Sequence, residues 1–291
     1  MNLLSFASAL ELDRPIMLLA MSGWVDAASV GTDAIDLIAE GGDVVAAFEP
    51  DALFDYRSSR PVLSFSSGEL TEISWPRLEI VHRRIDGVDL LIAHGHEPDF
   101  RWQQLTREFV ELTGRYDVSR FVTLGAVPAP VPHTRPVRVV CTTSDPGLLR
   151  DADTVLPNDL VVPGAAVSVL RQGVADAGIA AIGYWVQTPH YIQSPFYPGV
   201  LSLMGRVGDQ VGVTFPIGDL EEKAAAQLEE IDRDLSERAD ARDYVERLEQ
   251  MQDRQDEKDE PPPVFSFEDI PSPDEIGAEV ERFLRSAEDD D

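Results

Sequence analysis

The sequence predicts an α/β protein: a three-layer α/β/α core with a mixed sheet, followed by a C-terminal helical extension. Short apolar runs of strand length alternate with amphipathic helical patterns through residues 1–218. From residue 219 onward, apolar residues recur only at helical spacing. The chain has 291 residues, of which 43% are hydrophobic, so it can bury a sizeable core. We therefore expect one large domain with an appendage.

The elements of the core follow from local patterns. Residues 16–20 form a continuous apolar run typical of a buried strand, and a helix is expected over 26–40, closed by Gly41-Gly42. Asp86-Gly87 is a common tight-turn dipeptide and joins two further strands as a hairpin. The other expected strands are 44–48, 78–83, 88–93, 121–124, 137–141 and 179–186, and the other expected helices are 100–113, 163–177 and 198–211.

The C-terminal part divides into three segments after the core domain, residues 1–218. Residues 219–258 are expected to form an acidic amphipathic extension, either one long helix or a helix pair. Residues 259–273 are rich in proline and acidic residues and predict a linker. Residues 274–287 contain a short amphipathic helix, which we expect to pack on its own core or on a neighbouring subunit.

Charge and composition exclude several functional classes. The net charge is −29, and residues 219–291 alone hold 27 acidic and 9 basic residues, so we expect no nucleic-acid partner. Lys223 and Lys258 are the only lysines, which excludes a P-loop or Schiff-base lysine in the core. No apolar run reaches the roughly 18 to 20 residues that span a bilayer, and the N-terminus lacks a basic segment typical of a signal peptide. We expect a cytoplasmic protein without membrane contact.

Polar loops after the predicted strands hold the candidate pocket residues. They are Asp26 in SGWVDAAS, Arg57 and Arg60 in DYRSSRP, and His94, Glu97 and Arg101 in HGHEPDFRW. Loops at strand ends are where α/β proteins place their sites, and two arginines beside serines suit a phosphate or carboxylate. Each residue also has a structural interpretation, because Asp26 can cap a helix and the arginines can form surface ion pairs.

The His-Gly-His stretch raises the question of a metal site. His94 and His96 could bind a metal with Glu97 or Asp99, but a further converging ligand would be needed. In the alternative, Asp99 caps the following helix while His96 and Glu97 are solvated. The signatures GxSxG, HExxH, GxGxxG and CxxC are absent, so we assign no catalytic residue, no metal and no cofactor. The single cysteine, Cys141, closes an apolar strand and is expected to be buried.

The stretch TLGAVPAPVPHTRP (123–136) contains four prolines, which favour a stiff extended path after a strand. His133 and Arg135 are therefore interpreted as residues on the rim of a shaped loop. His190 and Tyr191 follow another strand among prolines and aromatic residues, in a composition that suits protein interfaces. We expect these four residues to line a loop rim that contacts other proteins.

Seven stretches carry a family resemblance in the right order over nearly the whole chain. They are GWVDAAS (23–29), DYRSSRP (55–61), LIAHGHEPDFRW (91–102), TLGAVPAPVPHTRP (123–136), VVPGAAVSVL (161–170), YWVQTPHY (184–191) and DEIGAEVERFLR (274–285). Together they resemble the proteasome assembly chaperone family, and most closely its bacterial, actinobacterial-type branch.

The resemblance implies a core similar to nucleoside phosphorylases and peptidyl-tRNA hydrolases, with a helical extension and usually without enzymatic activity. It also implies a homo-oligomer, for which we consider a trimer, with proteasome subunits or other cytoplasmic proteins as partners. Relatives that dock on the proteasome α-ring often end in a hydrophobic residue, tyrosine and any residue. This chain ends in Asp289-Asp290-Asp291, so we expect any such contact to use another surface.

Two functional hypotheses follow. The first is a non-catalytic assembly protein that forms a homo-oligomer. The alternative is a phosphorylase- or hydrolase-like enzyme, or a small-molecule or nucleotide-binding protein, with a polar pocket at the strand ends.

Overall fold

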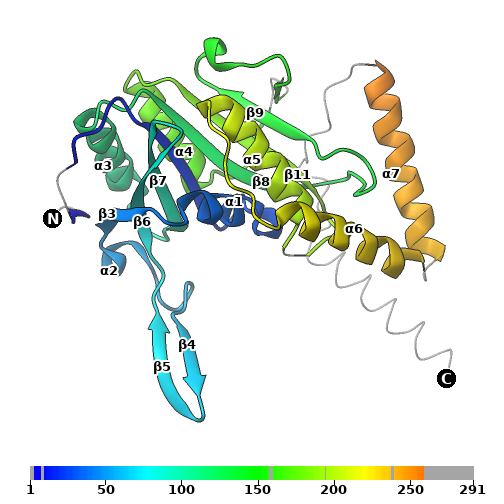
Figure 1. Cartoon of the computed structure of the whole chain (residues 1–291), viewed down its shortest axis with the longest axis horizontal. Helices are drawn as coiled ribbons and strands as arrows, with labels where there is room; N and C mark the ends of the chain where they lie inside the picture. The colour runs from blue at the N-terminus through cyan, green and yellow to red at the C-terminus, as the bar shows by residue number, and fades with distance from the viewer. Residues whose placement is uncertain (1–2, 8–9, 157–159, 194, 237–238, 259–291) are drawn as a thin grey trace.

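A nine-stranded mixed sheet forms the centre of the molecule, in the strand order β1-β3-β6-β7-β2-β8-β11-β9-β10 (Figure 1). The computed structural model describes residues 3–7, 10–156, 160–193, 195–236 and 239–258. The α/β class and the mixed sheet predicted from the sequence are confirmed. None of the helices in these ranges is long and apolar enough to cross a membrane.

Four parallel strands lie side by side in the middle of the sheet. They are β7 (Val88–His96), β2 (Ile16–Ser22), β8 (Arg120–Ala129) and β11 (Ala181–Pro189). Strands buried on both faces read as continuous apolar runs, and the first six residues of β2 are all buried. The parallel arrangement brings the carboxyl ends of the four strands to the same edge of the sheet.

The outer strands are mostly antiparallel and complete the sheet on both sides. On the β7 side they are β6 (Leu78–Ile85), β3 (Asp43–Phe48) and β1 (Leu4–Phe6); on the β11 side they are β9 (Val139–Thr143) and β10 (Thr154–Val155). Among these pairings only β9 with β10 is parallel. The predicted hairpin at Asp86-Gly87 joins β6 to β7 through two residues of positive φ.

Helices cover both faces of the sheet, and alternate residues of β2 face the two layers. Leu18 packs in the cluster that contains α1 (Val30–Ala39) and α5 (Tyr197–Val211). Met17 and Leu19 pack in the cluster that contains α3 (Trp102–Arg115) and α4 (Ala166–Asp176). Three short helical segments lie in the connections: η1 (Ala27–Ser29), α2 (Pro50–Leu53) and η2 (Pro146–Leu148).

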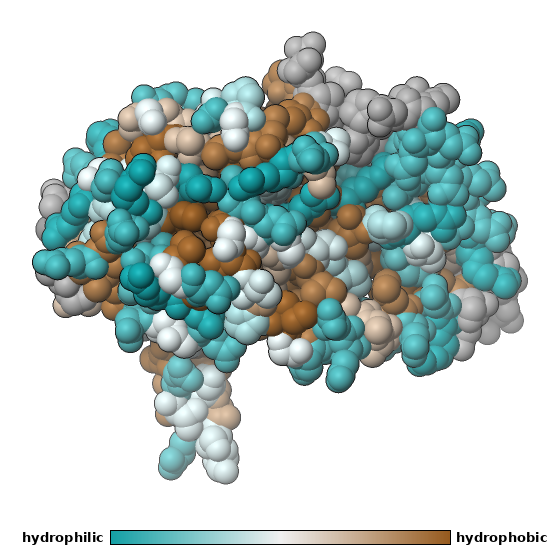
Figure 2. All heavy atoms as spheres, turned by 45° about the horizontal axis from the view of Figure 1, so that its top comes forward, coloured by the Kyte–Doolittle hydropathy of each residue, from teal (hydrophilic) through white to brown (hydrophobic). Residues whose placement is uncertain are grey.

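The acidic extension forms two helices rather than one, α6 (Leu220–Ser236) and α7 (Ala239–Lys258). Leu220 joins the core cluster beneath α5, whereas α7 stands at the side of the core (Figure 1). Val245 and Leu248 of α7 are nonetheless buried. The charged surface of the two helices forms a broad hydrophilic region on the right of Figure 2. The helix predicted within 274–287, the linker and the terminal aspartates lie outside the described residues.

A two-stranded ribbon that the sequence did not reveal projects from the core: β4 (Val62–Ser66) and β5 (Glu69–Ser74), shown in cyan in Figure 1. Every residue of both strands is exposed. The predicted strand 121–124 was also too short, because β8 continues through Pro128 to Ala129 in register with β11. The first helix begins at Val30 instead of residue 26, after the turn η1.

Gly95 of β7 tests how closely the sheet packs. Its φ is +142°, and a Cβ atom there would lie 2.0 Å from the carbonyl oxygen of Arg77. Because that neighbour is backbone, Gly95→Ala forces β6 and β7 apart, and we expect the free energy of unfolding to fall by about 2 kcal/mol or more. Gly114→Ala is the matched control: its Cβ meets nothing within 4 Å, and alanine in α3 should stabilise by about 0.5–1 kcal/mol. Urea titration measures both, and equal effects would contradict this packing.

Candidate functional site

The loops that follow the four central strands meet at one edge of the sheet. They begin after Ser22, His96, Ala129 and Pro189, and they hold most of the residues that the sequence singled out. The structure separates these residues into two groups. Asp26 and Glu97, after β2 and β7, bind backbone amides of the core, and the residues after β8 and β11 contact the acidic helices.

Asp26 caps α1. Its Oδ1 accepts hydrogen bonds from the backbone N–H groups of Gly31 (2.7 Å) and Thr32 (3.1 Å), and its Oδ2 accepts one from the Thr32 hydroxyl at 2.5 Å. Burial raises the pKa of Asp26, while the Thr32 and Gly31 hydrogen bonds oppose that shift. These contacts agree with the interpretation of Asp26 as a helix cap, because the carboxylate accepts from backbone N–H groups that have no partner within the first turn of a helix.

Glu97 joins two loops that are distant in sequence. Its Oε2 accepts a hydrogen bond from the Trp24 N–H at 3.1 Å, and its Oε1 accepts one from the Ala166 N–H at 2.6 Å. Ala166 is the first residue of α4, so the carboxylate also stabilises a helix N-terminus. Glu97 is not simply solvated, as the alternative to a metal site supposed.

The other residues of the His-Gly-His stretch face different neighbours. His94 Nδ1 lies 2.7 Å from Asp36 Oδ1 of α1, in the wall of a groove of about 930 Å³. His96 Nδ1 accepts from the Arg77 N–H at 3.3 Å. Asp99 accepts from Asp55 N–H (2.8 Å) and does not cap α3, which follows Arg101 in a left-handed conformation without a side-chain cap. Within the described ranges no group of three or more His, Cys, Asp or Glu residues is placed to hold a metal ion.

Arg57, Arg60 and Arg101 are exposed at the surface. Of the six candidate pocket residues, only His94 lines the wide groove, and none lines the apolar cavity at the ends of β8 and β11. The structure therefore does not bring these six side chains into either cavity together. Cys141 is buried as predicted, and burial raises the pKa of its thiol to about 11.

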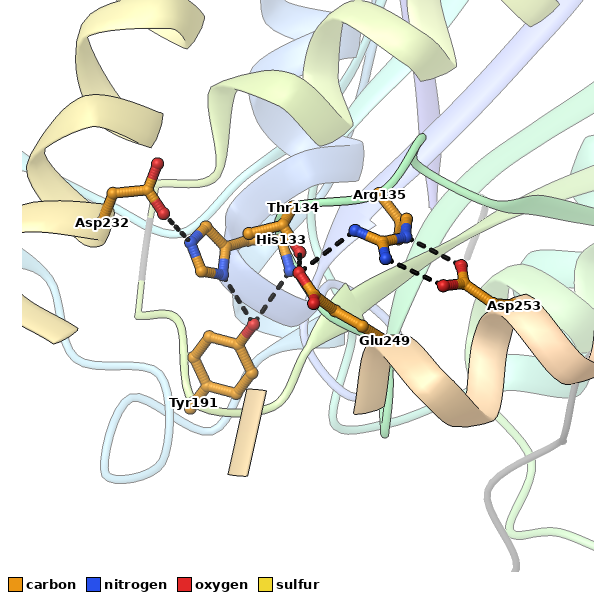
Figure 3. Close-up of polar contacts among 7 residues, drawn as sticks. All are labelled: His133, Thr134, Arg135, Tyr191, Asp232, Glu249 and Asp253. Carbon is orange, nitrogen blue, oxygen red and sulfur yellow. Dashed lines mark hydrogen bonds and ion pairs between the residues drawn. The ribbon is translucent and has the colours of Figure 1, made fainter. Parts of the chain in front are cut away.

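The four rim residues do come together, against the acidic helices, and Figure 3 shows three of them, His133, Arg135 and Tyr191. The Tyr191 hydroxyl accepts from the His133 N–H at 2.9 Å and lies 2.8 Å from His133 Nδ1. His133 Nε2 lies 3.0 Å from Asp232 Oδ1 of α6. Burial raises the pKa of Tyr191 to about 12. The phenol therefore keeps its proton, and the His133 ring connects Tyr191 to Asp232 through its two nitrogens.

Arg135 binds α7 through both edges of its guanidinium. Its Nε and Nη2 donate to the two carboxylate oxygens of Asp253 at 2.8 and 2.9 Å, and its Nη1 donates to Glu249 at 3.1 Å (Figure 3). Thr134 also donates to Glu249. Such bidentate pairing fixes geometry as well as charge. The hydrogen bond to Arg135 holds the pKa of Asp253 below its ordinary value.

Two further contacts extend this interface. Arg138 donates to Gln255 at 2.8 Å and also pairs with Asp256, one turn beyond Asp253. The Tyr244 hydroxyl lies 3.1 Å from His190 Nε2, and the ring of His190 meets the rings of Tyr191 and Tyr244 edge to face. We call the set His133, Thr134, Arg135, Arg138, His190 and Tyr191 the helix clamp. It attaches the acidic helices to the core.

The sequence analysis did not identify Arg138 as a residue of the helix clamp, and it did not identify the acidic residues that the clamp contacts. The partners are Asp232, Glu249, Asp253 and Asp256. A signal was present, because Glu249, Asp253 and Asp256 recur at helical spacing and so share a face. Arg135 and Arg138 also stand out as neighbouring cations in an acidic chain. The sequence did not show that α7 lies beside the segment that holds Arg135 and Arg138.

Comparison with known proteins finds one family and several solved structures. The PAC2 family model matches residues 20–235. A Mycobacterium tuberculosis protein of unknown function is 28% identical, with a TM-score of 0.82 over 89% of this chain and 91% of its own. The structure is also similar to that of a Streptomyces avermitilis PAC2 family protein, which is 31% identical, and to that of an M. tuberculosis proteasome-assembly chaperone homologue, which is 29% identical. For both, the TM-score is 0.72, and the match covers 79% of this chain and 99% of the other. No curated protein matches.

Removing the Arg135 guanidinium should loosen α7. We expect Arg135→Met to raise amide hydrogen exchange across residues 239–258 while exchange in the central strands stays unchanged, because the substitution removes contacts to both Asp253 and Glu249. Arg254→Met is the matched control, since Arg254 lies on α7 and, within the part of the chain that the structure describes, its side chain donates to the Gln250 carbonyl of the same helix. Equal exchange in the two variants would contradict the clamp.

The ion pair between Arg135 and Asp253 should depend on pH. The pKa of Asp253 is lowered from 3.8 in the folded chain, so the contact is fully present above that value and is lost as the pH falls through the lowered pKa. We expect carbon-13 NMR titration to place the Asp253 pKa below 3.8, and to return it toward 3.8 in Arg135→Met. Titration at the ordinary value in the unsubstituted chain would show that the pair does not form in solution.

Proposed function

Because the chain belongs to the PAC2 family, we propose that it is a non-catalytic assembly protein that works as a homo-oligomer and binds other proteins in the cytoplasm. The kinship with a proteasome-assembly chaperone homologue supports proteasome subunits as the first partners to test. The observation that carries the proposal is the exposed apolar face of the β4–β5 ribbon.

The ribbon is amphipathic. Leu63 pairs with Ile73 and Phe65 pairs with Leu70, so these four side chains share one face. The opposite face presents Ser64 against Glu72 and Val62 against Ser74. Alternation of this kind is the pattern of a strand with one buried face. Here the apolar side chains are between 43% and 63% exposed in the single chain.

An isolated two-stranded ribbon is marginal in water, and it becomes stable when its apolar face packs against another surface. The ribbon is anchored at its base, where Trp75 packs edge to face on Tyr56 at 4.8 Å. Its turn, Ser67-Gly68, has positive φ at both residues and fits the twist of a hairpin. Beyond that anchor, the apolar face requires a partner.

Charge supports a second copy of the chain as that partner. Two copies that each carry −29 repel one another, so they should meet through surfaces with little charge. Residues 61–68 contain no charged side chain, and the strands of the ribbon carry only Glu69 and Glu72. A ribbon with one apolar face can also pack on its own symmetry mate, as closed homo-oligomers require.

The helix clamp has a different part in this proposal. It keeps the acidic surface of α6 and α7 at a fixed place beside the core, away from the ribbon (Figure 1). A fixed acidic surface favours basic partners and raises the rate at which they associate. The ribbon would then join copies of the chain, and the acidic helices would face the protein that is being assembled.

Substitution within the ribbon tests the proposal. We expect the unsubstituted chain to show at least twice the monomer mass of 32.1 kDa in light scattering. Phe65→Asp should shift it toward the monomer, because it places a charge on the apolar face. Ser64→Lys is the control on the opposite face: it also introduces a charge, but one that lies across from Glu72, and it should leave the mass unchanged. A monomeric unsubstituted chain at micromolar concentration, or equal effects of the two variants, would refute the proposal.

A further inference from the structure

An apolar cavity of about 300 Å³ lies over the carboxyl ends of β8 and β11, on the face of the sheet that carries α3 and α4. It exists because α4 begins only at Ala166, so no helix covers Val127, Ala129 and Gln187 at the strand ends. Leu156, Leu160, Val162 and Pro163 also line it. Its volume is at the lower end of the range for small-molecule sites.

Two tryptophans give the cavity aromatic walls. Trp185 is buried, and its Nε1 donates to the Thr142 hydroxyl at 3.0 Å, so its polar atom is already satisfied. A Cβ on Gly125 would lie 2.7 Å from the indole of Trp185, so this glycine leaves room for the ring against the sheet. Trp24 lies at the entrance and is 54% exposed. The walls therefore suit an apolar or aromatic group.

Arg171 of α4 is the only charged residue among the lining residues that the structure describes. Its Nε is buried and has no hydrogen-bond partner in the described part of the chain. Burial lowers the pKa of this guanidinium, and among the described residues no carboxylate opposes that shift. Arg171 is half-buried, and a guanidinium whose buried Nε has no partner among the described residues is unfavourable. A carboxylate is the group that fits its paired donors.

We propose that this cavity binds a small amphipathic monocarboxylate. Its carboxylate pairs with Arg171, and its apolar part packs between Trp185 and Trp24. A single cation in an otherwise apolar cavity matches one negative charge on an apolar body, whereas a phosphate dianion would bring more charge than Arg171 can balance. The site is distinct from the ribbon and from the helix clamp, so it adds ligand binding to the proposed assembly function.

Octanoate and octanol are suitable probes because they share an apolar chain and differ in charge. Binding is measured by calorimetry and by the fluorescence of the lining tryptophans, on the full chain. We expect octanoate to bind at least tenfold more tightly than octanol. Arg171→Met should remove that preference, and Arg171→Lys should retain part of it. Arg107→Met, on the exposed surface of α3, is the matched control and should bind octanoate like the unsubstituted chain.

Several results would overturn the proposal. One is equal affinity for octanoate and octanol, or no binding of either probe. Another is tighter binding of inorganic phosphate or octyl phosphate than of octanoate. A third is that Arg107→Met loses as much affinity for octanoate as Arg171→Met does. If Arg171→Met does not fold, as judged by circular dichroism, Trp24→Ala takes its place. It removes an exposed wall residue, and we expect octanoate binding to weaken at least threefold without loss of the fold.

Discussion

The parallel pairing of β7, β2, β8 and β11 is the constraint on which the rest of the structure depends. Because the four strands run the same way, their carboxyl ends deliver four loops to one edge of the sheet. Asp26 and Glu97, after β2 and β7, use their carboxylates to cap helices. His133 and His190, after β8 and β11, contact the acidic helices. The apolar cavity lies over the same strand ends.

Electrostatics explains why the acidic extension binds where it does. An extension that is itself strongly acidic is repelled by most of an acidic core. The segment between β8 and β9 offers Arg135 and Arg138, three residues apart. Pro130, Pro132 and Pro136 restrict the path of this segment, so both guanidinium groups can be held in place for Asp253 and Asp256. Most of these pairs are exposed, and their strength should therefore depend on salt.

The sequence predicted those elements whose signal is local. The buried run of β2 and the hairpin at Asp86-Gly87 were correct, because apolar continuity and turn residues are properties of short segments. The end of β8 was missed because Pro128 lacks an N–H group and resembles a strand break, although its position opposite Thr188 tolerates it. The β4–β5 ribbon was missed because none of its residues is buried within the chain. Asp232, Glu249 and Asp253 could not be assigned to the rim, since their contacts span about a hundred residues.

We propose above that this chain binds copies of itself and other proteins. The most direct test is affinity capture of the chain from a lysate of the cells that produce it, followed by native mass spectrometry of the captured species. We expect complexes that contain two or more copies of the chain, with proteasome subunits among the proteins bound to them. Recovery of the chain only as a single 32.1 kDa polypeptide, with no second copy and no proteasome subunit, would contradict it.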